Sequence, residues 1–163
     1  ILFLLVVSLI LVFGLVITRG APYLPTLQKQ VDDALEMLKL QPGQTLLELG
    51  SGDGRMLAAA ARKGVYSVGY ELNPILVMWT RVRYWKYRHF ISVRWGDFWL
   101  AEWPESDAMY VFLLEKYMNK LDNKIIHYKK GQAYKVVSFG FEIRDRRVVE
   151  QRKGLRLYYY NQK

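Results

Sequence analysis

The chain has no cysteine and only two histidines among its 163 residues. Without cysteine there can be no thiol catalysis and no cysteine-based metal site, and the absence fits a reducing compartment. His89 and His127 are better explained as structural or surface residues than as acid-base catalysts. We therefore expect neither a metal site nor a catalytic triad, and the sequence identifies no catalytic residue.

Charged residues are absent from the first 17 residues, where only Ser8 and Gly14 are neither aliphatic nor aromatic. A helix of this length spans roughly 25 Å, slightly less than a bilayer core of about 30 Å. A cleaved signal peptide is the alternative, but no small-x-small site follows the run. We expect a retained single-pass transmembrane anchor over residues 1–18, and further residues upstream because Ile1 is not an initiator methionine.

Acidic residues are outnumbered, so the formal net charge is +9 and the pI is near 9.7. Arg19 and the basic body beyond it place the folded part on the cytoplasmic side by the positive-inside tendency. The anionic partner that such a charge attracts is either the acidic lipid surface or a nucleic acid. Charge spread over solvated faces without any partner is an equally open interpretation.

A glycine-rich loop is the most informative motif in the sequence. Residues 47–55 read Leu-Glu-Leu-Gly-Ser-Gly-Asp-Gly-Arg, and the alternate glycines allow a tight turn and a close approach to a ligand. The carboxylate of Asp53 would repel a bare phosphate. S-adenosylmethionine (SAM), which carries a sulfonium, an ammonium and a ribose but no phosphate, suits this loop better.

The segments around this loop form a Rossmann-like unit. An apolar strand is expected over 45–49, an alanine-rich helix over 55–63 and a second strand over 65–70. Glu71 follows 21 positions after Gly50, the spacing of a ribose-binding acid, so spacing does not exclude NAD. The Gly-x-Gly-x-Gly pattern, with Arg55 after it, disfavours NAD. A glycine-rich turn without a ligand is the remaining alternative.

The remaining segments alternate between helix and strand. A proline-stiffened linker over 22–26 leads to a helix that Thr26 would N-cap, and Asn73-Pro74 begins another helix. Further strands are expected over 90–95, 107–113 and 135–139, a helix over 114–125, and a hairpin of strands 147–150 and 155–160. In the Asn73-Pro74 helix, the core face is expected to hold Ile75, Met78, Trp79, Val82 and Trp85.

The basic residues of the same helix are expected to form a solvated face, with a lipid-contacting or substrate-contacting role as the alternative. The fold class that follows is α/β, a Rossmann-like doubly wound, mostly parallel sheet with a C-terminal antiparallel hairpin, preceded by one N-terminal transmembrane helix. The expected organisation is an anchor over 1–18, a linker and N-terminal helix over 19–44, and a SAM-binding domain over 45–163.

Four stretches carry a family resemblance: residues 22–26, 48–55, 69–77 and 97–99. From about residue 20 to about residue 160, the chain resembles the seven-stranded, class I SAM-dependent methyltransferases. More closely it is similar to the membrane-associated lysine methyltransferases of the adenine nucleotide translocase and the ATP synthase c-ring protein, and to their prokaryotic relatives. The resemblance implies a SAM-dependent methyltransferase tethered to the membrane that methylates a lysine of a membrane protein.

The resemblance also implies roles for individual residues. Glu71 would bind the ribose hydroxyls beside Leu72 and Asn73, and Asp97 with Phe98 would bind the adenine. Tyr23, Pro25 and Thr26 would close over the cofactor beside the acceptor lysine. The residues around the methionine part of SAM would be Glu48, Gly50, Ser51, Gly52, Asp53 and Gly54.

Glu115 and Tyr117 are further candidates on the substrate side, because they follow the fourth strand where ligands of α/β folds gather. Ordinary helix-start roles explain them as well. The segments 112–118 and 140–144 depart from the family, the first by lacking a proline and the second by being charged, and the helix before the final hairpin is missing or minimal. Methylation of RNA or of a lipid or quinone, and a non-catalytic SAM-binding docking module, remain as alternatives.

Overall fold

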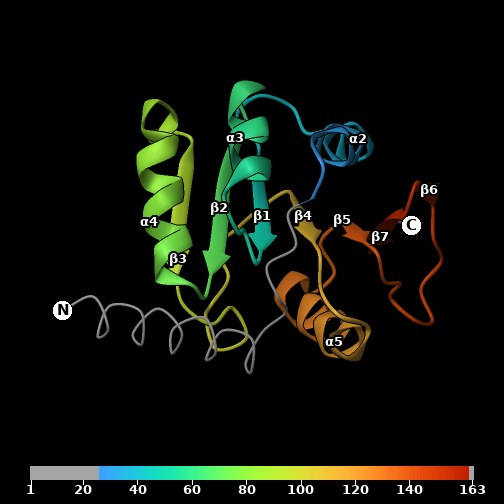
Figure 1. Cartoon of the computed structure of the whole chain (residues 1–163). Coiled ribbons are helices and arrows are strands. Elements are labelled where there is room, and N and C mark those ends of the chain that lie inside the picture. Colours follow the sequence, from blue (N-terminus) through green and yellow to red (C-terminus); the bar gives the residue numbers. More distant parts are fainter. Residues whose placement is uncertain (1–25, 162–163) are drawn as a thin grey trace.

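The computed structural model describes residues 26–161, which form one seven-stranded sheet with helices on both faces (Figure 1). The strand order is β3-β2-β1-β4-β5-β7-β6. Five parallel strands come first in the chain and a C-terminal antiparallel pair completes the sheet. The strands are β1 (Thr45–Leu49), β2 (Tyr66–Glu71), β3 (Ile91–Trp95), β4 (Ala108–Val111), β5 (Tyr134–Phe139), β6 (Glu150–Arg152) and β7 (Leu155–Tyr160). This topology confirms the expected sheet.

Helices α2 (Gln28–Leu38), α3 (Arg55–Arg62) and α4 (Pro74–Arg83) cover one face of the sheet. The prediction that Thr26 caps the first helix was wrong. Leu27 occupies the N-cap position, and its backbone N–H donates to Gln30 Oε1 at 3.0 Å. The Thr26 hydroxyl instead lies 3.2 Å from the hydroxyl of Tyr110, because β4 offers it a partner in the core.

Helix α5 (Met118–Lys129) and two irregular loops cover the other face. No helix forms over 96–107 or 140–149, so the expected loss of the helix before the hairpin is confirmed. Trp103 and Ile143 from these loops are buried against the sheet together with Leu121 of α5. Large side chains in the loops thus complete a core layer that helices would otherwise build.

The C-terminal hairpin differs from the predicted one in its first strand. The prediction ran this strand over 147–150, but β6 is Glu150–Arg152. Lys153 and Gly154 alone form the turn, with φ values of 42° and 86°. Two consecutive positive φ angles define a two-residue turn whose twist matches the flanking strands, so the pairing continues up to the turn itself.

The outward face of α4 was predicted as core, and this was wrong. Val77 and Thr80 are its buried residues, and Val77 packs with Leu57 of α3 and Val93 of β3. Thr80 faces the glycine-rich loop, which fixes the rotation of the helix. The opposite stripe is therefore exposed, and it holds Ile75, Met78, Trp79 and Val82, followed by Trp85 in the short 3-10 helix η1 (Trp85–Tyr87).

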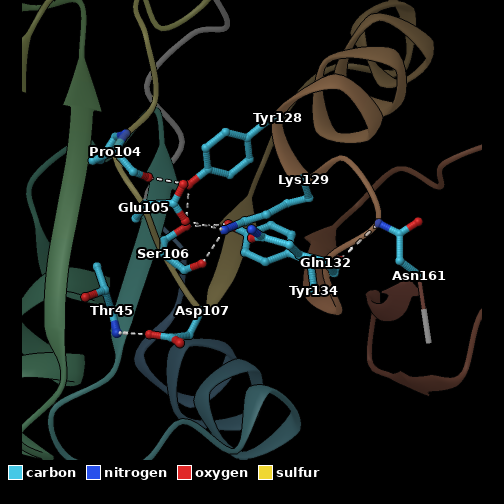
Figure 2. Close-up of polar contacts among 10 residues, drawn as sticks. All are labelled: Thr45, Pro104, Glu105, Ser106, Asp107, Tyr128, Lys129, Gln132, Tyr134 and Asn161. Carbon is cyan, nitrogen blue, oxygen red and sulfur yellow. Dashed lines mark hydrogen bonds and ion pairs between the residues drawn. The ribbon is translucent and has the colours of Figure 1, made fainter.

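A polar cluster closes the edge of the sheet where the parallel strands begin (Figure 2). The buried ammonium of Lys129 donates to Ser106 O at 2.7 Å and lies over the rings of Tyr128 and Tyr134 at 4.5 and 4.6 Å. Ser106 Oγ lies 2.6 Å from the Tyr134 hydroxyl. Each of these groups has a partner, so the cluster is explained by the packing of α5 against β4 and β5.

Among residues 26–161, no helix is long and apolar enough to cross a bilayer. The predicted anchor over residues 1–18 lies outside the described residues, as do Tyr23 and Pro25.

Candidate functional site

The glycine-rich loop joins the end of β1 to α3 and is held against the end of β2. The backbone N–H groups of Gly50 and Ser51 both donate to Tyr70 O at 2.9 Å. The three loop glycines have φ values of 83°, 54° and 76°. The loop therefore lies at the carboxyl ends of the parallel strands, where open α/β sheets bind their ligands.

Gly54 is the position where this loop meets α4. A Cβ built on Gly54 would lie 2.3 Å from Thr80 Cγ2 and 2.9 Å from Thr80 Oγ1. The Thr80 hydroxyl also lies within 3.4 Å of Gly52 O, to which it can donate. Glycine is thus required at position 54 by both its positive φ and the close approach of α4.

Glu48 is a buried acid that lacks a hydrogen-bond partner for one of its oxygens. Within the described part of the chain, Oε2 of Glu48 and Oγ of Ser51 are the buried side-chain atoms left without a hydrogen bond. Burial raises the pKa of Glu48 well above its usual value, and the nearby charges of Asp53 and Glu71 raise this pKa further. A buried acceptor without a donor is costly, so this position suits a ligand that brings a cationic N–H group.

Glu71 closes the opposite side of the loop from the end of β2. Its Oε2 accepts from Gly52 N and its Oε1 from Asn73 N, both at 2.8 Å. Burial raises the pKa of Glu71, although the hydrogen bonds from these backbone N–H groups oppose the rise. Each carboxylate oxygen keeps a further lone pair, so Glu71 can accept from ligand hydroxyls while it holds the loop.

Asn73 and Leu72 contribute structure as well as position. The Asn73 side chain accepts from Ile75 N at 2.9 Å and so caps α4. Leu72 O accepts from Trp95 Nε1 at 3.0 Å, which joins the ends of β2 and β3. Sequence reasoning missed Trp95, which ends an edge strand and carries no motif.

Asp53 points to a partner that the sequence analysis did not assign. Its carboxylate forms an ion pair with Arg55 at 2.8 Å, and Arg55 Nη1 donates to Thr26 O at 2.6 Å. Burial alone would raise the pKa of Asp53, but the hydrogen bond and charge of Arg55 outweigh it and hold the pKa below its usual value. Arg55 thereby fastens the segment at Thr26 to the glycine-rich loop. The acid-basic spacing 53–55 is the signal that could have revealed it.

Thr26 meets a second residue that the sequence did not single out. Tyr110 is buried in β4, directly opposite Glu48 of β1 in the strand register. Burial raises the pKa of Tyr110, so its hydroxyl stays protonated and is available to Thr26 Oγ1. The predicted substrate-side residue Thr26 and the predicted cofactor residue Glu48 are thus linked through one tyrosine.

The loop after β3 brings Asp97 and Phe98 to the same edge of the sheet. Gly96 N donates to Glu71 O at 3.0 Å, and Asp97 Oδ1 accepts from Trp99 N at 2.8 Å. From α5, the ammonium of Lys124 donates to Phe98 O, Trp99 O and Ala101 O at 2.9, 2.8 and 3.0 Å. One side chain therefore holds the whole turn in place.

An aromatic row connects the predicted cofactor side to the predicted substrate side. The ring centroids of Phe98 and Trp99 are 4.7 Å apart, and those of Trp99 and Tyr117 are 5.8 Å apart. Glu115 lies farther out, exposed and paired with Arg144 at 2.6 Å. This ion pair joins the two loops in which the sequence departs from the family, and it occupies a carboxylate that had been a substrate-side candidate.

A cavity of about 310 Å³ lies elsewhere, at the amino ends of β1, β4 and β5. Its lining includes Gln44, Asp107, Lys129 and Lys135, none of which was predicted as a site residue. Because it opens at the edge opposite the glycine-rich loop, it is separate from the site built from Glu48, Glu71 and Asp97.

The strand order, the glycine-rich loop after β1 and the acid at the end of β2 define a class I, seven-stranded SAM-dependent methyltransferase domain. A sequence profile of the ANTKMT methyltransferase domain matches residues 48–150. The chain belongs to this family.

Individual relatives agree with this assignment. The chain is 36% identical over 106 residues to the human lysine N-methyltransferase of the ATP synthase c-ring protein, an alignment that covers 64% of this chain and 45% of the human protein. It is 31% identical over 127 residues to a protein-lysine N-methyltransferase of Saccharolobus islandicus, covering 76% of this chain and 78% of that protein. The alignment thus spans less than half of the human relative.

A solved structure also matches. The RNA methyltransferase of Salinibacter ruber, crystallised with S-adenosyl-L-homocysteine, superposes with a TM-score of 0.74 and 27% identity. The match covers 84% of this chain and 92% of that one.

Proposed function

We propose that the chain is the catalytic domain of a SAM-dependent protein-lysine N-methyltransferase whose substrate is a membrane protein. The observation that carries the cofactor assignment is the buried Oε2 of Glu48, left without a donor at the loop. The ammonium of SAM would supply that donor, and the ribose hydroxyls would supply donors to Glu71. Two of the relatives are named for lysine methylation of the ATP synthase c-ring protein and of adenine nucleotide translocase, both membrane proteins.

When bound, SAM supplies a methyl group on a sulfonium, which a nucleophilic amine can displace in line. The protein's part is then to bind, orient and exclude water rather than to form a covalent intermediate. In this chain Glu48, Gly52, Asp53 and Glu71 would bind the cofactor, with Asp97 and Phe98 at the adenine. No step requires an acid-base triad.

The acceptor lysine must lose its proton before transfer. Bringing an amine from a pKa of about 10.4 to neutrality corresponds to roughly 4 kcal/mol, so an apolar environment or a carboxylate has to help. The row of Phe98, Trp99 and Tyr117 offers the apolar environment. Tyr23, Pro25, Thr26 and Glu115 stay predictions on the substrate side, and the predicted anchor over residues 1–18 would hold the domain beside a membrane-embedded acceptor.

The test is transfer of a labelled methyl group. The full chain is incubated with methyl-labelled SAM and membranes, and the products are separated after acid hydrolysis. We expect label in methyllysine. Label found only in lipid or RNA, or no transfer by a folded chain that binds SAM, would overturn the lysine assignment.

RNA methylation is the second candidate because the Salinibacter ruber relative is named an RNA methyltransferase. The same assay with added RNA separates the two functions. Label in nucleosides, together with RNA binding that falls steeply as salt rises, would favour RNA as the acceptor.

The raised pKa of Glu48 predicts a pH dependence. Since the pKa in the folded state lies above the unfolded value, the stability that this group contributes is present at low pH and is lost as pH rises through the folded-state pKa. SAM binding favours the ionised form, so SAM affinity should rise with pH over the same interval. Calorimetric titrations should show this rise in the wild type and its loss in Glu48→Gln, whereas an equal slope in both would contradict it.

A further inference from the structure

An apolar stripe on α4 faces away from the protein. Ile75, Met78, Trp79 and Val82 follow helical spacing and are 43%, 61%, 52% and 69% exposed. Trp85 in η1 continues the stripe at 64% exposure. These five residues are called the α4 patch below. Isolated exposed apolar residues need no explanation, but a continuous stripe of this kind marks an interaction surface.

The α4 patch lies within a strongly cationic segment. Residues 72–96 contain five arginines and lysines and no aspartate or glutamate. Arg83 lies over the ring of Trp79 at 5.6 Å, and Arg88 lies over the ring of Trp85 at 5.1 Å. Within the described part of the chain, every ion pair lies outside this segment. Its cations are therefore not held in direct ion pairs by carboxylates of residues 26–161.

We propose that the α4 patch, with Arg83, Lys86 and Arg88, binds the surface of an anionic lipid bilayer. An interfacial helix places aliphatic side chains below the headgroups, tryptophans at their level and cations against the phosphates. The α4 patch provides all three in one stripe. Arg83 and Arg88 already lie beside tryptophan rings, as groups that share the headgroup layer would.

Other partners fit this composition less well. Nucleic acid would use the arginines and the tryptophans, but it has no place for the aliphatic stripe of Ile75, Met78 and Val82. A second copy of the chain would bring two cationic faces together, which like-charge repulsion disfavours. A lipid surface satisfies the apolar stripe and the cations at the same time.

This contact would also orient the site. Helix α4 begins at Pro74, directly after the predicted cofactor residues Leu72 and Asn73. Trp95, exposed at the end of β3 and bonded to Leu72 O, extends the apolar surface to the edge of the sheet that holds the site. A bilayer lying on α4 would therefore keep the carboxyl edge of the sheet close to the lipid surface.

The cysteine-free sequence allows a direct test on the full chain. Val82→Cys introduces a single thiol for an environment-sensitive fluorophore, and Ile126→Cys is the matched control. Ile126 is an exposed apolar residue of α5, on the opposite face of the sheet, at 46% exposure. Each labelled protein is mixed, without SAM, with vesicles of phosphatidylcholine alone or with phosphatidylglycerol added.

With phosphatidylglycerol vesicles, we expect the label at position 82 to shift its emission to the blue and to be quenched by brominated lipids, while the label at 126 does not respond. An anchor in the N-terminal segment would act equally on both proteins, so only the difference between them reports the face. Replacing Arg83, Lys86 and Arg88 together by glutamine should weaken the response, by about fivefold for each cation removed.

An equal response at both positions, or no response at 82, would overturn the proposal. So would a response at 82 to RNA or to an acidic protein but not to vesicles. Because the measurement needs no methyl transfer, its outcome is independent of the proposed enzymatic activity.

Discussion

Replacing Glu71 by alanine should weaken SAM binding about a hundredfold, since hydrogen bonds to an ionised carboxylate contribute about 1.5–3 kcal/mol each. The same change should lower the free energy of unfolding by about 2–4 kcal/mol, because it leaves the Gly52 and Asn73 N–H groups without their acceptor. Isothermal titration calorimetry measures the first effect and chemical denaturation measures the second.

Glu102→Ala is the matched control for this experiment. It removes the same charge from an exposed position outside the site, so SAM affinity and stability should stay close to those of the wild type. Comparable losses in both variants would mean that the Glu71 effect is one of general charge. Unchanged binding in Glu71→Ala would remove Glu71 from the cofactor site.

Replacing Gly54 by alanine should lower the free energy of unfolding by about 3–4 kcal/mol. About 1–2 kcal/mol of this comes from forcing a residue with a Cβ into the left-handed region. The rest comes from the clash with Thr80, since overpacking typically costs about 1–3 kcal/mol. Thermal and urea unfolding of the variant measure the total.

Thr80→Ala separates the two contributions. It removes the two atoms that come closest to the new Cβ, so the double variant should recover the overpacking part and keep the backbone strain. Gly43→Ala is the control for strain alone, because its φ is +87° and nothing lies within 4 Å of its Cβ. If Gly43→Ala and Gly54→Ala cost the same, the close approach of α4 has no energetic weight.

The sheet and the glycine-rich loop could be predicted from the sequence because local signals specify them. The apolar run 45–49, the alternate glycines and Glu71 after a second apolar run all act within about 25 residues of one another. The strand order then follows from the family topology. The boundaries of β4 and β6 were misplaced by a few residues, since pairing across the sheet decides where a strand ends.

The orientation of α4 could not be predicted in the same way. The helix carries apolar residues on two sides, and periodicity favours the stripe with Trp79 and Val82 over the smaller one with Val77 and Thr80. Contact with Gly54 decides between the two sides, and that contact depends on how α3 and α4 pack. A small polar residue that fits against a glycine thus outweighs a larger apolar surface.

The partners of the site residues were also hidden from sequence reasoning. Arg55 and Tyr110 reach Thr26 from α3 and β4, segments whose proximity exists only in the folded sheet. The ion pair of Glu115 with Arg144 likewise joins loops that are 29 residues apart. The residue types were visible in the sequence, but the pairings were not.

The turn over 97–101 depends on the ammonium of Lys124 for three of its carbonyl contacts. A helix in this place would satisfy its own carbonyls one by one, whereas here a single flexible side chain acts as a clasp. Any chemistry that neutralises that amine would unfasten Asp97 and Phe98 from α5 while leaving the glycine-rich loop intact. The adenine end of the pocket is therefore the end that can be loosened independently.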